Sequence, residues 1–375
     1  MDRLNAAELM ARVEAKVDRM IGQIGDKCPH FAGKEGVYDN TSLEWWTSGF
    51  WPGLLWVMHG VTGKAHYKEA AWHWDERLER WFIAPDGQLH HDVGFQFLPT
   101  AVIKYKETGD KDGLRRGLEA ANYLAGRFNP AGNFIRAWNG DRIGWAIVDC
   151  MMNIPLLFWA SEISQDPRFK HIAMRHADTA LRVSVRDDGS VNHIVSFDPE
   201  SGEFIEAIGG QGLAADSAWS RGTAWGLHGF ALAYRWTGEV RYLNAAKRIA
   251  HYFLAALPED SVPYWDFRLE STDGEPRDSS AAAIAASGLL EIAESVPAAE
   301  RSLYAGAAER ILLSLTERYA TWDLPAHEAI LTAATGHRPA GNFIDGSLIY
   351  GDYYYVEAIA KLCGWRSRVF APVRA

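Results

Sequence analysis

The sequence predicts an all-α protein, an (α/α)6 barrel of six inner and six outer helices. Three observations lead to this fold class. Helical periodicity covers almost all of the 375 residues, whereas strand-like alternation is scarce. The predicted helices are of two kinds, which alternate along the chain. Loosely similar segments also return at intervals of roughly 60 residues.

The helical pattern predicts twelve helices. The first opens the chain as an amphipathic segment, and the last contains the motif IYGDYYYVEA. The expected ranges are 4–24, 46–60, 66–82, 94–107, 113–128, 146–163, 167–184, 219–236, 240–256, 279–293, 299–319 and 351–363.

One kind of helix is rich in small residues and apolar on most sides, as in FWPGLLWVMHG, GTAWGLHGFALAYRW and SSAAAIAASGLLEIA. A helix that is apolar all round belongs in the interior. The other kind carries many charges on one face, as in LRRGLEAANYLAGRF and RYLNAAKRIAHYFLAAL. These segments fit an outer layer with one solvated face.

The links between helices also alternate. Each inner helix leads to the next outer one through a short turn, such as GVTGKAHY or RWTGEVRY. The links back to the next inner helix are long, the longest lying between residues 184 and 219. All long links should therefore gather at one end, where a site is usually built. An open helical solenoid is the alternative, but its repeats would be shorter and more uniform. Because no linker interrupts the pattern, we expect a single domain, 1–375.

Composition narrows the function. A net charge of −10 argues against nucleic acid and against an anionic membrane surface as partners, but it allows a small anionic substrate. The first helix is charged throughout, and no run of 18 apolar residues follows, so we expect a cytoplasmic protein. Cys28, Cys150 and Cys363 lie far apart and form neither a disulfide framework nor a zinc pattern. Sixteen tryptophans suit stacking against sugar rings, although a tryptophan-rich core would also use them.

Distinctive motifs lie at or just before the starts of inner helices, at the end that holds the long links. They bring tryptophan, aspartate, histidine, arginine and glycine to one cavity mouth. These motifs are WWTSGFWPG (45–53), HHDVGFQF (90–97), GWAIVDCMMNIP (144–155), DSAWSRGTAWG (216–226), PRDSSAAA (276–283) and IYGDYYYVEA (349–358).

Asp92 and Asp149 are the candidate catalytic carboxylates. Each opens an inner helix among apolar residues. An N-cap is the alternative role, and a helix N-terminus would hold the pKa of a carboxyl group low. A general acid needs the opposite, a pKa raised by burial or by a nearby negative charge. Two carboxylates in one site supply that charge, so that one stays ionised while the other holds a proton. The spacing alone does not say which.

Other candidates are less specific. His90 and His91 are neighbours, and on an extended segment their side chains would point in opposite directions, so we expect neither a metal site nor a cofactor. Arg221 is placed for a forked contact with a substrate carboxylate, although an exposed or aspartate-paired arginine is the alternative. Asp278 is a candidate helix cap, and Tyr353 to Tyr355 are candidate core residues.

Several motifs, in their order along the chain, resemble the unsaturated glucuronyl hydrolases of glycoside hydrolase family 88. They extend from about residue 30 to residue 363, and the family fold is the (α/α)6 barrel. The matching stretches are WTSGFWPGLLW, HHDVGFQF, IVDCMMNIPLLFWASE, DSAWSRGTAWGLHGFALAYRWTGE, VPYWDF, RDSSAAAIAASGLLEIA and SLIYGDYYYVEA.

The resemblance implies an enzyme that releases a 4,5-unsaturated uronic acid from the non-reducing end of lyase-generated oligosaccharides, such as glycosaminoglycan disaccharides. Enzymes of this kind hydrate the C4=C5 vinyl ether rather than attack the anomeric carbon. By similarity, Asp149 is the acid that protonates C4 and then activates water, and Asp92 is the second carboxylate. The resemblance implies stacking by Trp46, Trp138 and Trp225 and polar contacts from His193, Gln211 and Arg221. The loop ATGHRPAGNFIDGS offers His337 and Arg338 as aglycone contacts.

Three rivals stay open at this point. An unsaturated rhamnogalacturonyl hydrolase would share fold and reaction but act on pectin fragments, and the HHDVGF motif favours the glucuronyl group. A conventional inverting glycosidase would act on saturated glycosides. A non-catalytic sugar-binding barrel would keep its function without Asp149.

Overall fold

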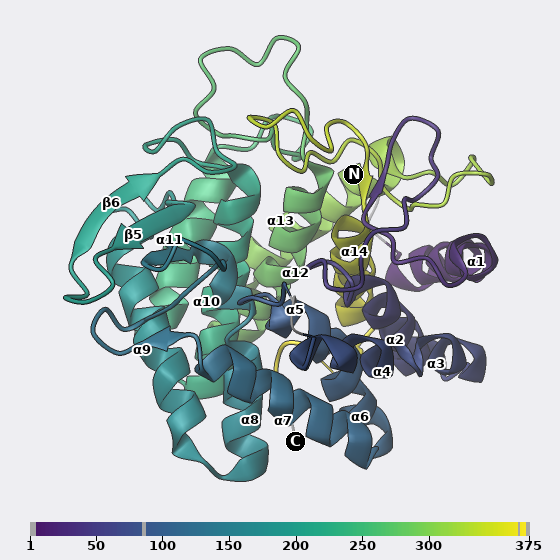
Figure 1. Ribbon diagram of the computed structural model, residues 1–375. Coiled ribbons are helices and arrows are strands. Elements are labelled where there is room, and N and C mark those ends of the chain that lie inside the picture. Colours follow the sequence, from purple (N-terminus) through teal and green to yellow (C-terminus); the bar gives the residue numbers. More distant parts are fainter. Residues whose placement is uncertain (1–4, 85–87, 367, 373–375) are drawn as a thin grey trace.

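The computed structural model describes residues 5–84, 88–366 and 368–372, and most of them are helical, as predicted (Figure 1). The inner helices are buried along most of their length, which confirms the interior position predicted from their apolar character. They are α2 (Phe50–Thr62), α8 (Pro155–Ser164), α10 (Ser220–Thr237), α12 (Ser279–Ser295) and α14 (Ile349–Leu362). The charged helices bury one face each. They are α1 (Ala6–Ile24), α7 (Lys111–Ala125), α9 (Pro167–Val183), α11 (Val240–Ala255) and α13 (Ala298–Ser314).

Two of the expected helices are interrupted. The range 66–82 holds α3 (Ala65–Ala71), α4 (Trp74–Glu79) and a 3₁₀ turn, η1 (Arg80–Phe82). The range 94–107 holds α5 (Val93–Phe97), a π-helical turn, η2 (Leu98–Val102), and α6 (Ile103–Thr108). Pro99 explains the second interruption, because its ring nitrogen cannot donate the hydrogen bond that would continue α5 as a regular helix. A second π-helical turn, η4 (Leu315–Tyr319), follows α13.

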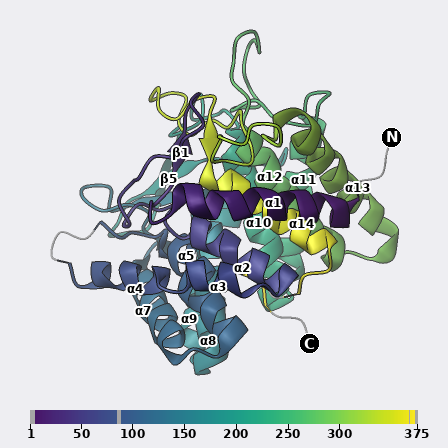
Figure 2. The same ribbon diagram turned by 90° about the vertical axis from the view of Figure 1, so that its right-hand side faces the viewer.

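The inner helices contact one another in sequence. α10 packs on α12, α12 on α14, and α14 on α2. On the other side, α2 contacts η2, and α5 contacts α8. The alanines, serines and glycine of α12 permit the close approach to α10. A methyl group at Gly288 would lie 2.5 Å from the Leu227 side chain. Each inner helix except α14 also packs on the outer helix that follows it in the chain, and α1 lies across α14 (Figure 2).

The long links gather at one end, shown at the top of Figure 1, as predicted. Within them lie small antiparallel sheets that the sequence analysis did not predict. β1 (Phe31–Ala32) pairs with β7 (Ser347–Leu348), and β2 (Phe128–Asn129) pairs with β3 (Phe134–Ile135). A third sheet has the order β4 (Trp145–Ile147), β5 (Ile194–Phe197), β6 (Phe204–Ile208).

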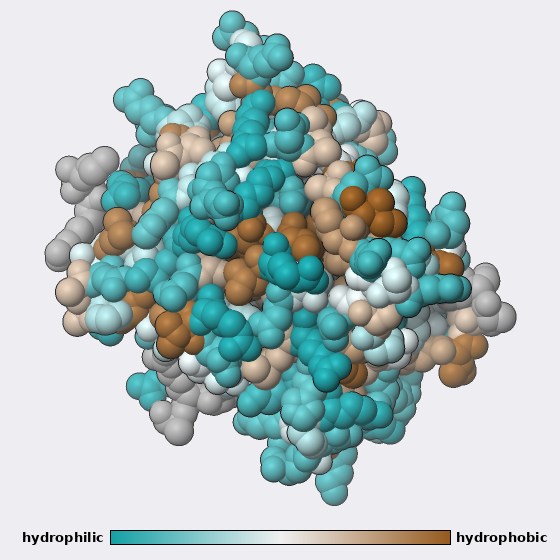
Figure 3. All heavy atoms as spheres, turned by 90° about the vertical axis from the view of Figure 1, so that its left-hand side faces the viewer, coloured by the Kyte–Doolittle hydropathy of each residue, from teal (hydrophilic) through white to brown (hydrophobic). Residues whose placement is uncertain are grey.

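The third sheet corrects one predicted helix. The range 146–163 begins as strand β4, continues as a 3₁₀ turn, η3 (Val148–Met152), and becomes helical only at Pro155. Hydrophilic side chains cover most of the face on which β6 lies, with apolar side chains between them (Figure 3). Among the described residues, no helix combines the length and the apolar character needed to cross a bilayer.

Candidate active site

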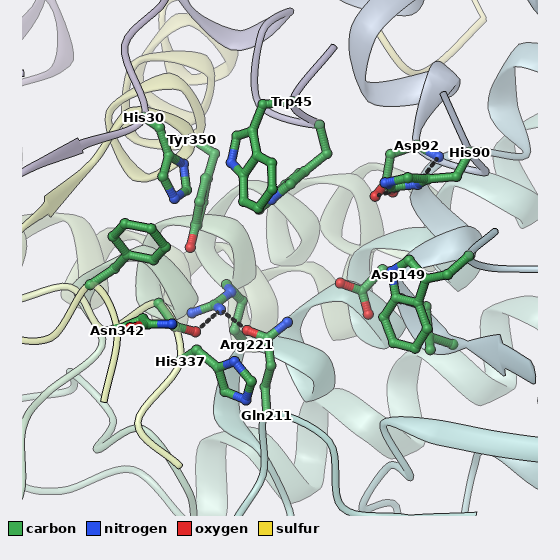
Figure 4. A pocket seen from close by; sticks show the side chains of 15 residues that line it. His30, Trp45, His90, Asp92, Asp149, Gln211, Arg221, His337, Asn342 and Tyr350 are labelled. Atoms are coloured by element: carbon green, nitrogen blue, oxygen red, sulfur yellow. Dashed lines mark hydrogen bonds and ion pairs between the residues drawn. The ribbon is translucent and has the colours of Figure 1, made fainter. Parts of the chain in front are cut away.

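A cavity of about 310 Å³ opens at the end of the molecule where the long links gather. The two candidate carboxylates lie at one end of it, and His30, Asn342 and Tyr350 lie at the other (Figure 4). Its walls come from many separate segments of the chain. The lining residues are His30, Trp45, Trp46, His90, Asp92, Trp138, Ile147, Asp149, Gln211, Arg221, Gly336, His337, Asn342, Phe343 and Tyr350.

Asp92 lies at the N-cap position of α5, but its side chain makes no capping hydrogen bond. Its Oδ1 instead accepts a hydrogen bond from Asn153 Nδ2 at 2.9 Å. Nitrogens of His90 and His91 lie 3.4 Å from its two oxygens. Burial raises the pKa of Asp92, and the charge of Asp149 raises it further. The carboxylate is therefore not used as a helix cap and faces the cavity.

Asp149 lies in η3, directly after β4. Its Oδ2 is buried and has no hydrogen-bond partner among the described residues. Burial raises the pKa of this carboxyl group to about 7, against the opposing charge of Arg221. A carboxyl group in this environment can hold a proton near neutral pH, which is the requirement for a general acid.

His193, the residue before β5, faces Asp149, with 3.7 Å between its Nε2 and Asp149 Oδ2. Its Nδ1 accepts a hydrogen bond from the backbone N–H of Gln211 at 2.9 Å. In a neutral ring the hydrogen must then reside on Nε2, which points at the acid. Burial and the charge of Arg221 lower the pKa of His193 to about 3, so the ring is neutral at physiological pH.

Arg221 is buried, with 1% of its surface exposed, and both terminal nitrogens of its guanidinium are already occupied. Nη1 donates to Asp278 Oδ2 at 2.7 Å and to the Thr335 carbonyl, and Nη2 donates to Gln211 Oε1 and to the Gly336 carbonyl. The predicted forked contact with a substrate carboxylate does not fit this arrangement, because both terminal nitrogens bind protein oxygens. Arg221 instead fixes the Gln211 amide and supplies a positive charge. Asp278 also caps α12, as predicted.

The three tryptophans expected to stack on sugar rings differ in position. Trp46 and Trp138 line the cavity. Trp225 is fully buried and does not line the cavity, because its ring packs against Phe95 at 5.0 Å and against Tyr354 at 5.4 Å. The expected stacking contact is therefore not available to Trp225 in this structure. Its indole supports the cavity from behind.

The expectation that His90 and His91 point in opposite directions is wrong. The two rings stack, with centroids 5.5 Å apart, because residues 91–92 form a turn rather than an extended strand. Nitrogen and oxygen atoms of His90, His91 and Asp92 lie within 4.8 Å of one another, close enough to share a metal ion. These are the residues that a metal would use if the site took one.

Several lining residues were missed from the sequence. Trp45 and Tyr350 belong to motifs that the sequence analysis had marked, so they could have been found there. His30 lies in a loop without periodicity and gives no signal, whereas Asn342 and Phe343 lie in the loop ATGHRPAGNFIDGS, from which only His337 and Arg338 are predicted. His337 lines the cavity as expected, whereas Arg338 does not. Its guanidinium pairs with Glu275 at 3.2 Å.

Known proteins are similar to this chain in both sequence and fold. The model of Glycosyl Hydrolase Family 88 matches residues 16–356. An unsaturated glucuronyl hydrolase of Bacillus sp. strain GL1 is 39% identical over 362 residues, covering 92% of this chain and 93% of that protein. An unsaturated chondroitin disaccharide hydrolase of Streptococcus agalactiae is 34% identical, covering 93% of this chain and 91% of the relative.

Solved structures agree with the sequence comparison. The unsaturated glucuronyl hydrolase of Bacillus sp. GL1 superimposes with a TM-score of 0.91 at 36% identity, covering 95% of this chain and 96% of that one. A variant of the Streptococcus agalactiae enzyme in complex with dGlcA-GalNAc6S gives a TM-score of 0.85 at 30% identity, covering 96% of this chain and 93% of that one. The chain therefore belongs to glycoside hydrolase family 88.

Proposed function

We propose that this enzyme removes a 4,5-unsaturated uronic acid from the non-reducing end of small lyase-generated oligosaccharides, with glycosaminoglycan-type disaccharides as the main substrates. One observation carries the proposal. Two buried carboxyl groups, Asp92 and Asp149, line one small cavity, and burial raises the pKa of both. The names of the relatives, which include unsaturated glucuronyl and chondroitin disaccharide hydrolases, support the choice of substrate.

The geometry suits hydration of a vinyl ether. Asp149 gives its proton to C4 of the substrate, and positive charge develops at C5 and the ring oxygen. The ionised Asp92 stabilises that charge. Asp149, now a carboxylate, takes a proton from water as the water oxygen bonds to C5. The hemiketal so formed opens by breaking the bond between C5 and the ring oxygen, and the hemiacetal left at C1 then releases the aglycone.

The remaining cavity residues would bind the substrate. Trp46 and Trp138 present apolar surface to sugar rings, and the Gln211 amide, held by Arg221, presents polar atoms. The positive charge of Arg221 favours an anionic uronate, although both of its terminal nitrogens already donate to protein oxygens. His193 holds its Nε2 hydrogen toward Asp149 and the sugar.

We also propose that the inner helices close into an (α/α)6 barrel within a single domain, 1–375. The succession of contacts α10–α12–α14–α2, continued by α5 against α8 and η3 against α10, supports closure. Absence of a metal or cofactor stays a prediction. Dialysis against EDTA should leave activity unchanged if it is right. A cytoplasmic location also stays a prediction.

The test uses the chromophore of the substrate. The conjugated C=C absorbs ultraviolet light, and hydration destroys it. We expect absorbance to fall with unsaturated chondroitin disaccharide and to fall much more slowly with unsaturated rhamnogalacturonan disaccharide. The reverse preference would favour the rhamnogalacturonyl rival. Hydrolysis of saturated glycosides without loss of the chromophore would favour a conventional glycosidase and reject the proposal.

A further inference from the structure

Asn153 contacts both candidate carboxylate residues, and it lies in the motif GWAIVDCMMNIP without being a predicted site residue. Its side chain is fully buried where η3 meets the start of α5. Nδ2 donates to Asp92 Oδ1 at 2.9 Å and to the backbone carbonyl of Asp149 at 3.3 Å. Oδ1 accepts a hydrogen bond from the backbone N–H of Phe95 at 2.8 Å. Because a backbone N–H can only donate, it fixes the amide, and Nδ2 has to face Asp92.

From this geometry we infer that Asn153 is a positioning residue that favours the ionised form of Asp92 and so helps to leave the proton on Asp149. The inference rests on the proposed function, which needs this distribution of charge. An amide N–H stabilises a carboxylate, and it cannot accept a hydrogen bond from a protonated carboxyl group. Asp149 Oδ2 receives no such donor.

The other groups around the pair do not decide the matter. Repulsion between the two carboxylates counts against whichever ionises second, so it does not choose between them. Each carboxylate has one arginine acting on it, Arg127 on Asp92 and Arg221 on Asp149. The remaining titratable neighbours are neutral near pH 7, since burial lowers the pKa of each histidine and raises those of the thiol and the phenol. They are His90, His91, His193, Cys150 and Tyr350. A side-chain amide donates to Asp92, whereas Asp149 accepts a hydrogen bond only from its own backbone N–H among the described residues.

Asn153→Asp separates this role from packing. The new side chain has nearly the same size and keeps an oxygen for the Phe95 N–H, but it replaces the donor to Asp92 with a carboxyl group. Asp92 should then ionise less readily. We expect the acidic limb of the kcat/KM profile to move up by about one pH unit or more, so that kcat/KM at pH values on that limb falls about tenfold.

A second variant and a control complete the experiment. In the Asn153→Ser variant the side chain is too short to reach Asp92, so the acidic limb should move in the same direction. This variant tests the inference if Asn153→Asp does not fold. Gln96→Leu removes a different buried amide, which lies on α5 and donates to the Glu44 and Trp45 carbonyls. We expect it to change KM and stability but to leave both limbs in place.

The outcomes are distinguishable. If the wild-type protein does not consume the chromophore of any unsaturated disaccharide, the proposed function fails. If the wild type is active and the folded Asn153 variants give pH profiles that superimpose on its own, the inference alone fails. A shift of the acidic limb in the Gln96→Leu control equal to that in the Asn153 variants would also overturn it, because a general loss of rigidity would then explain the effect.

Discussion

At the scale of single residues, the proposed chemistry depends on Asp149. Its Oδ2 is buried without a partner, and its carboxyl group is the proton donor of the proposed reaction. We expect Asp149→Asn to lower kcat by about 10²–10⁴-fold, the usual contribution of a general acid, while the fold is kept. Asp92→Asn should be nearly as damaging. Loss of chromophore under saturating substrate, with circular dichroism as the check on folding, measures both. Substantial activity in Asp149→Asn would leave the mechanism without its acid.

The raised pKa of Asp149 gives a second prediction. Because the acid must be protonated, kcat/KM should fall about tenfold for each pH unit above about 7. The same shift affects stability. The folded state binds this proton more tightly than the unfolded chain, whose carboxyl group titrates near 3.8, so stability is lost as pH rises from 3.8 through about 7. Asp149→Asn should therefore unfold at a higher temperature than the wild type at pH 8, and at a similar temperature at pH 4. An equal difference at both pH values would contradict this.

The types of single residues and their sequence context predicted much of the site. The contacts that depend on the folded geometry could not be predicted in this way. Asp92 and Asp149 could be chosen because a carboxylate among apolar residues at a helix start is unusual. The occupation of Arg221 by four protein oxygens could not be foreseen, since two of them are backbone carbonyls of a loop more than a hundred residues away. Trp225 was misjudged for a related reason. Its motif places it near the site, but only packing decides that the indole lies behind the wall.

At the scale of elements, α5 and η3 meet through a glycine. An added methyl group at Gly94 would lie 2.5 Å from the Asn153 Cα and 2.7 Å from its carbonyl oxygen. We expect Gly94→Ala to separate the two elements, to destabilise the protein by about 1–3 kcal/mol and to lower kcat. Thermal unfolding and kinetics test it. The matched control is Gly22→Ala in α1, which meets no atom within 4 Å and should stabilise by about 0.5–1 kcal/mol. A Gly94→Ala variant with the stability and kcat of the wild type would show that α5 and η3 can move apart without cost.

Elements were predicted well where periodicity is strong and poorly where it is absent. The long amphipathic helices α1, α9 and α11 lie within a few residues of their expected ranges. The sheet of β4, β5 and β6 was missed because its strands are three to five residues long, and so short a segment shows no clear period. Local sequence does not show that β4 and β5 pair across nearly fifty residues, yet this pairing sets His193 against Asp149.

At the scale of the whole molecule, a group of buried charges joins three inner helices at a distance from the cavity. Glu291 of α12 lies 2.7 Å from Lys361 of α14 and 3.0 Å from Arg235 of α10. These cations hold the pKa of the buried Glu291 carboxyl low, against the effect of burial, so its contribution to stability is present above the unfolded pKa near 4.5 and is lost as pH falls toward the folded one.

Removing this charge should be costly. Glu291→Gln removes the carboxylate that both cations share, leaving Arg235 only with Glu294 and Lys361 only with Glu357 among the described residues, and we expect a loss of about 3 kcal/mol in the free energy of unfolding. Urea denaturation at pH 7 measures it. Glu14→Gln, which breaks an exposed pair with Lys64, serves as control and should change stability by less than about 1 kcal/mol. Similar small effects of both substitutions would mean that the buried group does not hold the three helices together.

The contacts of the first segments with the last have a consequence for biosynthesis. Tyr38 donates a hydrogen bond to Asp352, and Lys16 donates one to the carbonyl of His327. These two hydrogen bonds can form only after residues some 310 positions further along the chain have been translated. While the ribosome is still adding α14, the apolar face of α1 lacks the inner helix on which it packs. The nascent chain should therefore reach its native state only after release, and chaperones that shield emerging hydrophobic segments should raise its yield.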